Sequence, residues 1–479
     1  MSLTLVACGG GSSNPPDANP PDAAPPVVTL GVPCTDTTDD VYKLPASEPA
    51  FDETHRGDVF RCSRDRWIDA ASLDAAARVA GYVGPTLTSG ATIFRIAYRT
   101  ERATEGTELV EGHSAGFLLV PDAPRATGAL VVYAHPTVGI APICAPSHLD
   151  LGARDDGWEA VRSPMLAMVG AGFTVIAPDY AGFSYGEPPS FAISSDEGRS
   201  ILDATRAATH LLPTAIRPGK VVIVGHSIGG HGALSAHAMA ASYGHDGELV
   251  GVATYAPFWV SNLAWGGLLS PSLGFNTTTA SYLLAYDLIY FYTHGEVLDG
   301  PGHGVDLIKP EKQAAVTTLV TTKCLTPVAE GMKDLGATPA DYFTPTAVSV
   351  LGNCGLSGNC TTDPSPKWFT RFLADRPAID AAGAPIVMWF GEKDTTVTPG
   401  FARCAVEKIE KDLGTSGTTA ITLCDDPDGE HSTGPKKQAA WVNDWIAARV
   451  DGTAEPTCTA PKAPADGGAA CPALPPNQF

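Results

Sequence analysis

The chain has 479 residues, of which 44% are hydrophobic and 17% charged, a balance typical of a globular protein with a sizeable core rather than of a disordered chain. Its formal net charge is −21 at pH 7, which argues against nucleic acid or an anionic membrane surface as partner, because phosphates would be repelled. The sequence contains no run of about 18 apolar residues, so we expect no transmembrane helix.

The N-terminus carries a segment typical of exported bacterial lipoproteins. Leu5-Val6-Ala7-Cys8 followed by Gly9 resembles a lipobox, in which the cysteine is lipidated and becomes the mature N-terminus. Fewer residues precede Cys8 than a signal peptide needs. We therefore expect residues 1–32 to be a truncated lipoprotein signal followed by a disordered tether rich in Pro, Gly and Ala, with Cys8 as the candidate lipid anchor to the outer membrane.

Cysteine usage also favours export to the cell envelope or the exterior. The chain has 11 cysteines, and setting Cys8 aside leaves an even number, which suits a disulfide-bonded protein in an oxidising compartment. The connectivity cannot be read from the sequence, but the local pairs that we consider are Cys354–Cys360, Cys404–Cys424 and Cys458–Cys471. No C-x2-C pair occurs, so we expect no zinc site.

Short apolar runs alternate with helical segments along most of the chain. Residues 94–98 and 116–120 are expected to form a hairpin, and further strands are expected at 129–134, 174–177, 221–224, 249–254, 386–390 and 421–424. Helices are expected at 199–212 and 228–243, and a terminal helix is expected to begin at Pro435. Apolar strands separated by helices predict an α/β fold with a mostly parallel sheet covered on both faces.

Residues 258–381 interrupt this alternation. They include a segment, 276–294, that is apolar nearly all round, so the helix it forms is either buried or covers an apolar ligand. We interpret 258–381 as an inserted, mainly helical cap over the site, with this aromatic-rich helix as cap core rather than substrate wall. Residues 33–257 and 382–479 are then the catalytic domain.

Gly225-His226-Ser227-Ile228-Gly229 follows an apolar run and leads into a segment of small residues. Strand, G-x-S-x-G and helix in this order place a serine on a sharp turn above the sheet, where the flanking glycines make room for it. We predict Ser227 as a catalytic nucleophile and the N–H of Ile228 as one donor of an oxyanion hole.

A serine hydroxyl needs a neutral imidazole as base and a carboxylate that orients it. Asp394 lies in the loop after the expected strand 386–390, and we predict it as the acid, with Glu392 as its nearest rival. His431 follows the last expected strand, and its position in the order Ser, acid, His predicts it as the base.

The second oxyanion donor should come from the loop after the strand 129–134. Pro136 has no N–H, so we predict Thr137, or failing that Val138, as the donor. We expect His135 to brace this loop.

With these motifs the chain resembles the secretory lipase family of α/β-hydrolases, the yeast lipase A-like enzymes with bacterial members, over about residues 40–448. The resemblance implies an α/β-hydrolase fold and ester hydrolysis under a cap inserted before the acid loop, and Pro136 departs from the family's glycine. It rests on the three site motifs and on further matching segments: Tyr98-Arg99-Thr100, Ala134-His135-Pro136-Thr137-Val138-Gly139, Cys144-Ala145-Pro146-Ser147, Pro178-Asp179-Tyr180-Ala181-Gly182 and Glu197-Gly198-Arg199-Ser200-Ile201-Leu202-Asp203-Ala204.

The leading hypothesis is a serine carboxylic-ester hydrolase (esterase or lipase) that acts on small-molecule or lipid esters and needs no cofactor and no metal. A second hypothesis keeps the triad but makes the enzyme a serine peptidase or amidase, whose cap would bind a substrate amine through acidic residues. A third is a non-catalytic binding protein on a hydrolase scaffold, which is disfavoured because all three triad candidates are present. The acidic cap residues are Glu296, Asp299, Glu330 and Asp334.

Overall fold

The computed structural model describes residues 28–106, 108–151, 159–269, 278–413 and 419–460, so Cys8 lies outside the described part. The last five residues of the expected tether, 28–32, lie within the described part of the chain. There the N–H of Gly31 donates to the carbonyl of Leu211 at 2.6 Å, and Val28, Leu30 and Val32 pack against the core. Residues 28–32 therefore belong to the folded domain, because every second side chain in this segment is apolar and can be buried.

The described strands form one nine-stranded sheet in the order β1-β2-β3-β5-β4-β6-β7-β8-β9. β1, β2 and β3 run antiparallel, and the strands from β5 to β9 pair in parallel. The predicted hairpin and the six further strands are all present, whereas β1, with its many charged residues, was not expected. The bounds are β1 Val59–Ile68, β2 Ala91–Arg102, β3 Val110–Pro121, β4 Ala129–Ala134, β5 Thr174–Ala181, β6 Lys220–His226, β7 Glu248–Tyr255, β8 Ile386–Gly391 and β9 Ile421–Asp426.

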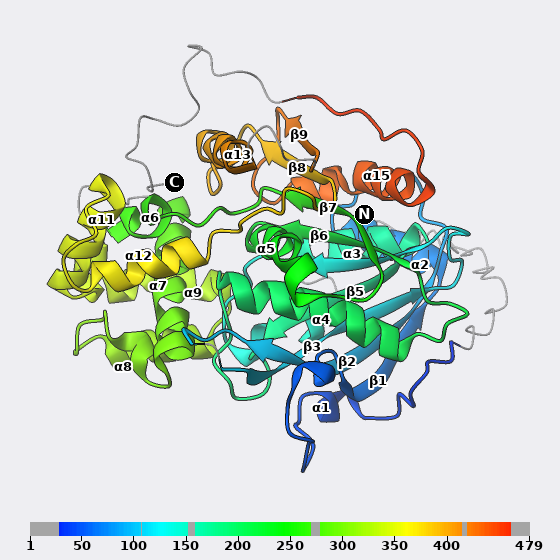
Figure 1. Cartoon of the computed structure of the whole chain (residues 1–479), viewed down its shortest axis with the longest axis horizontal. Coiled ribbons are helices and arrows are strands. Elements are labelled where there is room, and N and C mark those ends of the chain that lie inside the picture. The colour runs from blue at the N-terminus through cyan, green and yellow to red at the C-terminus, as the bar shows by residue number, and fades with distance from the viewer. Residues whose placement is uncertain (1–27, 107, 152–158, 270–277, 414–418, 461–479) are drawn as a thin grey trace, which may run out of the picture.

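Helices cover both faces of the sheet (Figure 1). α4 (Ser194–Leu211) and α5 (Ile228–Tyr243) pack together on one face, and α2 (Ala70–Val79), α3 (Glu159–Gly170) and α15 (Ala439–Asp451) cover the other. The expected terminal helix is divided into α14 (Gly434–Lys437) and α15. None of the helices in the described part of the chain combines the length and the apolarity needed to cross a membrane.

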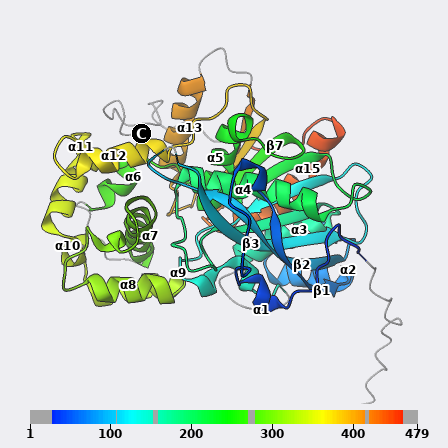
Figure 2. The ribbon, with the colours of Figure 1, turned by 60° about the horizontal axis from the view of Figure 1, so that its bottom comes forward.

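A group of helices stands beside the sheet, at the left of Figure 1, and the same group lies together in Figure 2. It comes from the stretch between β7 and β8, and we call residues 258–381 the cap. Its side chains form a hydrophobic cluster of their own around α7, which also takes in Ile140, Phe191 and Ile228 from outside the cap. The helices are α6 Asn262–Trp265, α7 Thr278–His294, α8 Gln313–Thr322, α9 Leu325–Leu335, α10 Pro339–Tyr342, α11 Gly352–Ser357 and α12 Ser365–Ala374.

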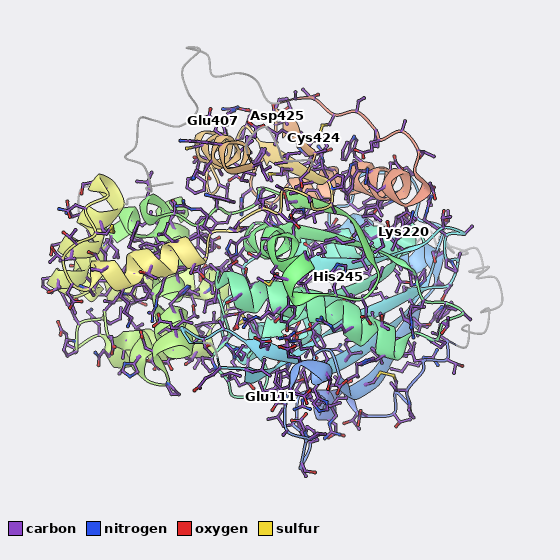
Figure 3. All side chains as sticks on the ribbon, in the orientation of Figure 1. Glu111, Lys220, His245, Glu407, Cys424 and Asp425 are labelled. Atoms are coloured by element: carbon purple, nitrogen blue, oxygen red, sulfur yellow. A yellow bond between two sulfur atoms is a disulfide. The ribbon has the colours of Figure 1, made fainter. Side chains whose placement is uncertain are left out.

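The disulfides correct two of the three local pairs considered from the sequence. Cys354–Cys360 is present, but Cys424 on β9 (Figure 3) bonds to Cys458, so the pairs Cys404–Cys424 and Cys458–Cys471 are wrong. The reason is that the C-terminal segment runs back along β9, where the N–H of Asp425 donates to the carbonyl of Thr459 at 2.7 Å. Cys404 is also disulfide-bonded, and Cys34–Cys62 is a further bond.

Cys144–Cys324 joins the loop after β4 to the start of α9, across 180 residues of sequence. The same two segments form an isolated β-bridge between Gly139 and Cys324, and the N–H of Leu325 donates to the carbonyl of Val138 at 3.0 Å. One edge of the cap is thereby fixed, covalently and by backbone hydrogen bonds, to the loop that follows β4.

We predict that the double variant Cys144→Ser, Cys324→Ser loses about 2–4 kcal/mol of unfolding free energy, because this bond closes a very long loop in the unfolded chain. Urea unfolding without reductant measures the loss. The matched control, Cys354→Ser with Cys360→Ser, removes a bond that spans only 6 residues and should cost less. Equal losses in the two variants would contradict the prediction.

Candidate active site

Ser227 occupies the sharp turn between β6 and α5. Its φ of +56° is a conformation that residues other than glycine rarely adopt, and neighbouring backbone groups hold it there. The N–H of Ser227 donates to the carbonyl of Tyr255 at 2.9 Å, and the N–H of Phe258 donates to the carbonyl of Ser227 at 3.0 Å. The turn is thus fixed to the segment that leaves β7.

The glycines on either side of the turn have no room for a side chain. A Cβ on Gly225 would lie 2.1 Å from the carbonyl oxygen of Gly229, and a Cβ on Gly229 would lie 2.1 Å from the carbonyl oxygen of Ala134. The start of α5 therefore sits directly against β6 and the end of β4, which is why the motif requires glycine at both positions.

The structure brings the three predicted catalytic side chains together in one chain of hydrogen bonds. Nε2 of His431 lies 2.9 Å from Oγ of Ser227, and Nδ1 of His431 lies 2.8 Å from Oδ2 of Asp394. Because a carboxylate only accepts, we assign the proton to Nδ1, which leaves Nε2 free to accept from the serine hydroxyl. The rival acid, Glu392, instead forms an ion pair with Arg403.

Asp394 is 3% exposed and both of its carboxylate oxygens have partners. Oδ2 faces His431, while Oδ1 accepts the backbone N–H groups of Thr396 at 2.7 Å and of Val397 at 2.9 Å. These donors come from the same loop after β8, so the loop itself sets the direction of the carboxylate. A carboxylate held in this way can fix one orientation of the imidazole.

His226 was not singled out in the sequence, yet it contacts the base. Its Nε2 donates to the backbone carbonyl of His431 at 2.8 Å, and the centroids of the two rings are 5.1 Å apart. Burial, together with the neighbouring His431, lowers the pKa of His226 to about 3. His226 is therefore neutral at working pH. The sequence gives no signal for this role, since His226 is simply a variable position of the motif.

The two predicted oxyanion donors lie beside Ser227. Ile228 is the first residue of α5, where a helix leaves its N–H groups without intrahelical partners, and Thr137 follows β4. Both residues line one cavity with Ser227. Nearby, the ring of His135 stacks on Tyr180 at 4.4 Å and its nitrogens contact the carbonyls of Pro136 and Asp179. These contacts agree with the bracing role expected for His135.

The cavity at Ser227 is small, with a volume of about 30 Å³, and is almost entirely apolar. It lies between the cap and the carboxyl ends of the parallel strands, where open α/β sheets place their ligands. α7 contributes both to the cap core and to this wall, so the expectation that it would form only cap core was too narrow. The described residues lining the cavity are Thr137, Phe191, Ser227, Ile228, Phe258, Trp265, Leu268, Leu283, Tyr286 and Thr396.

One group of side chains has spacing that could suit a metal ion. The ligand atoms of Glu48, Glu111 and His113 lie within 4.8 Å of one another. Glu111 is labelled in Figure 3. Arg99 already pairs with Glu111, and Nδ1 of His113 lies 2.7 Å from Glu187. We therefore interpret the group as an ion-pair cluster and assign no metal to it.

Comparison with known proteins agrees with this geometry. The model of the α/β hydrolase family matches residues 131–410, more than half of the chain. The chain belongs to the α/β-hydrolase family. The predicted fold, with its mostly parallel sheet and helices on both faces, is thereby confirmed. The sequence matches none of the curated proteins compared with it.

Solved structures of other proteins have the same fold as this hydrolase. Candida antarctica lipase A superposes with a TM-score of 0.61 at 19% identity, over 88% of this chain and 87% of that one. The rice cell wall degrading esterase LipA from Xanthomonas oryzae, in a ligand-bound form, superposes with a TM-score of 0.59 at 18% identity, over 83% of this chain and 97% of that one. At these identities the likeness concerns the fold.

The depressed pKa of His226, about 3, predicts a loss of stability in acid. Below pH 6.5 the unfolded chain binds a proton at this histidine and the native state does not, so the unfolding free energy falls as the pH drops toward 3. His226→Gln keeps a side-chain N–H donor and removes the titration. Between pH 7 and 5 the variant should therefore lose about 2 kcal/mol less than the wild type.

Urea unfolding at both pH values measures this difference. Other buried groups, such as Asp179, whose pKa burial raises to about 7, are common to both proteins and cancel in the comparison. Parallel stability curves for the two proteins would contradict the neutral, buried state of His226.

Proposed function

We propose that this hydrolase is a serine carboxylic-ester hydrolase of the secretory lipase type, with Ser227, His431 and Asp394 as its catalytic triad. The observation that carries the proposal is the hydrogen-bonded chain of these side chains at the mouth of an apolar cavity. Nucleophile, base and orienting acid within hydrogen-bond reach, next to donors for an oxyanion, are the parts that acyl transfer needs.

In the proposed reaction Oγ of Ser227 attacks the ester carbonyl while Nε2 of His431 takes the hydroxyl proton. Asp394 stays ionised and stabilises the imidazolium that forms. The N–H groups of Ile228 and Thr137 stabilise the negative oxygen of the tetrahedral intermediate. His431 then returns the proton to the leaving alcohol, and a water activated by the same imidazole hydrolyses the acyl-enzyme to acid and free Ser227.

The lining of the cavity favours an ester over a peptide substrate with a charged amine. It includes no charged side chain among the described residues. The acidic cap residues considered for an amine site are engaged elsewhere or lie outside the lining. Asp299 pairs with Arg371 and Lys367, and Glu296 accepts the backbone N–H groups of Gly302 and Gly304.

Two further inferences accompany this function. The similar structures include a lipase and an esterase, which supports ester substrates for this chain. The disulfides favour an oxidising compartment, which supports export to the bacterial cell envelope or beyond, with Cys8 as the lipid anchor.

Ser227→Ala should lower kcat for p-nitrophenyl butyrate by at least about 10³-fold, and Asp394→Asn by about 10⁴-fold, because the amide stabilises the wrong imidazole tautomer. Steady-state kinetics and labelling of Ser227 by a fluorophosphonate measure both effects. The matched control is Asp428→Asn, an exposed carboxylate that pairs with Lys393 and should keep wild-type activity. Equal activity in wild type and Ser227→Ala would refute the proposal.

A further inference from the structure

We infer that the site is specific for short, uncharged acyl groups and that the side chain of Trp265 sets this limit on length. Trp265 is held in place by a buried polar network, which we call the hub: Asp375 with Tyr290, His294, Ser194 and His231. The inference rests on the proposed ester hydrolysis and deepens it.

The cavity itself limits the size of the acyl group. Its volume of about 30 Å³ lies far below the range of roughly 300–1,000 Å³ that ligand pockets occupy, so it leaves little room for a long acyl chain. Its surface is nearly all apolar, and no charged side chain lines it among the described residues. A charged acyl group would be desolvated there without a partner, which is costly.

Trp265, on α6, is fixed by aromatic neighbours. It is 2% exposed, and its ring stacks on Tyr290 of α7 with centroids 4.4 Å apart and planes 17° from parallel. Phe258 lies 4.9 Å and Phe191 6.1 Å from it. A ring packed on several sides cannot turn aside to lengthen the cavity without leaving a void, which is costly in a close-packed interior.

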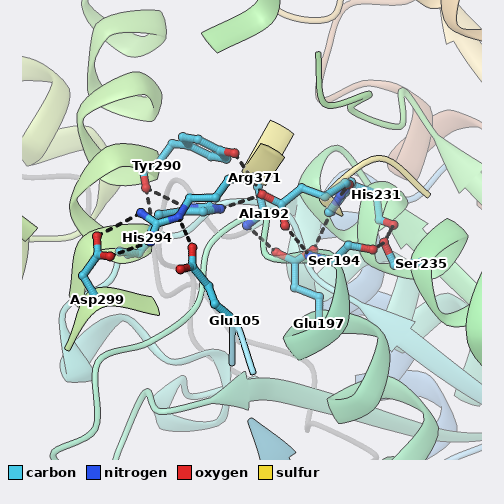
Figure 4. A network of polar contacts seen from close by, with 12 residues as sticks. Glu105, Ala192, Ser194, Glu197, His231, Ser235, Tyr290, His294, Asp299 and Arg371 are labelled. Carbon is cyan, nitrogen blue, oxygen red and sulfur yellow. Dashed lines mark hydrogen bonds and ion pairs between the residues drawn. The ribbon is translucent and has the colours of Figure 1, made fainter. Parts of the chain in front are cut away.

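Tyr290, which is labelled in the polar network of Figure 4, is held in turn by Asp375 at the end of α12. The hydroxyl of Tyr290 donates to Oδ2 of Asp375 at 2.9 Å, and Nε2 of His294 lies 2.7 Å from the same oxygen. Oδ1 of Asp375 accepts the backbone N–H of Ser194 at 3.1 Å. Both carboxylate oxygens thus join the cap helix α7 to the start of α4.

The hub also reaches the helix that carries the nucleophile. His231 lies on the first turn of α5, shortly after Ser227, and its Nε2 donates to the backbone carbonyl of Asp375 at 2.7 Å. Its Nδ1 lies 2.7 Å from Glu197 of α4, and His231 is fully buried. The position of Trp265 is therefore fixed relative to Ser227 through three consecutive contacts: Trp265 on Tyr290, Tyr290 on Asp375 and Asp375 on His231.

Measurement of kcat/KM for p-nitrophenyl acetate, butyrate, octanoate and palmitate tests the inference. We expect a maximum at acetate or butyrate and at least a tenfold fall to octanoate, since the extra methylenes do not fit the cavity. Trp265→Ala should raise the octanoate-to-butyrate ratio at least tenfold. A wild-type maximum at octanoate or palmitate would overturn the inference, as would an unchanged ratio in a folded Trp265 variant.

Tyr290→Phe separates the hub from simple aromatic packing, because it keeps the ring and removes only the hydroxyl that Asp375 accepts. It should shift the same ratio toward octanoate by a few-fold, through KM rather than kcat. The matched control is Tyr342→Phe, a buried tyrosine of the same cap cluster that does not line the cavity and should leave the ratio unchanged. Identical octanoate-to-butyrate ratios in the two tyrosine variants would contradict the role of the hub in positioning Trp265. Trp265→Phe is the milder variant if Trp265→Ala fails to fold.

Covalent probes separate this inference from the proposed function. Methylphosphonofluoridate and octylphosphonofluoridate each form an Oγ–P bond with Ser227 and release fluoride, with the proton passing to His431. We expect rapid labelling by the methyl probe and at least tenfold slower labelling by the octyl probe. Slow octyl labelling without hydrolysis of any ester would support the wall and contradict the esterase. Equal labelling rates with active ester hydrolysis would contradict only the wall.

Discussion

The candidate active site depends on the close approach of the start of α5 to β6 and to the end of β4. With glycine at 225 and 229 the backbones approach so closely that an added Cβ would meet a carbonyl oxygen at 2.1 Å. Within this close approach Ser227 has a positive φ of +56°, whose cost is offset by the packing of the surrounding sheet. The loop with Thr137 leaves β4 at the same point. The same region of close backbone contact thus positions both Ser227 and the loop that carries a proposed oxyanion donor.

The backbone that carries His431, the proposed base, is held by an uncharged side chain. The neutral Nε2–H of His226 donates to the carbonyl of His431, and His226 directly precedes Ser227, so the proposed nucleophile and base share one anchor. In the proposed reaction His431 takes the serine proton and becomes a cation, with the ring of His226 only 5.1 Å away. A cation at His226 would oppose that step, and burial keeps the pKa of His226 near 3. Asp394 is then the nearest charge that the imidazolium meets.

Features that depend on local sequence could be predicted, and those that depend on distant segments could not. The strand, the glycine-flanked turn and the helix around Ser227 are consecutive in the sequence, and Asp394 and His431 each follow an apolar strand, so these features could be predicted. Cys424, by contrast, bonds to Cys458 because the C-terminal segment returns along β9, which no spacing reveals. The strand β1 was missed because its sequence, VFRCSRDRWI, is charged and half-exposed. The cap wall likewise arises from contacts between α6, α7 and α12, far apart in the sequence.

The buried polar groups where the cap meets the core favour a single position of the cap. Asp375 accepts hydrogen bonds from Tyr290, His294 and Ser194 while it is 4% exposed. Tyr290, His294 and Asp375 all belong to the cap, so moving the cap off the core would break the hydrogen bonds from the N–H of Ser194 and from His231 to Asp375. Buried polar groups left without partners cost about 1–3 kcal/mol each, whereas an apolar interface could slide with little change in energy. Arg371, on the same helix, adds a contact from the cap to Glu105 of the core, while its two-pronged pair with Asp299 lies within the cap. A polar interface of this kind contributes more to a unique arrangement than to net stability. The α7–α12 side of the cap therefore behaves as a fixed wall, and selectivity for the acyl group follows from its position relative to Ser227.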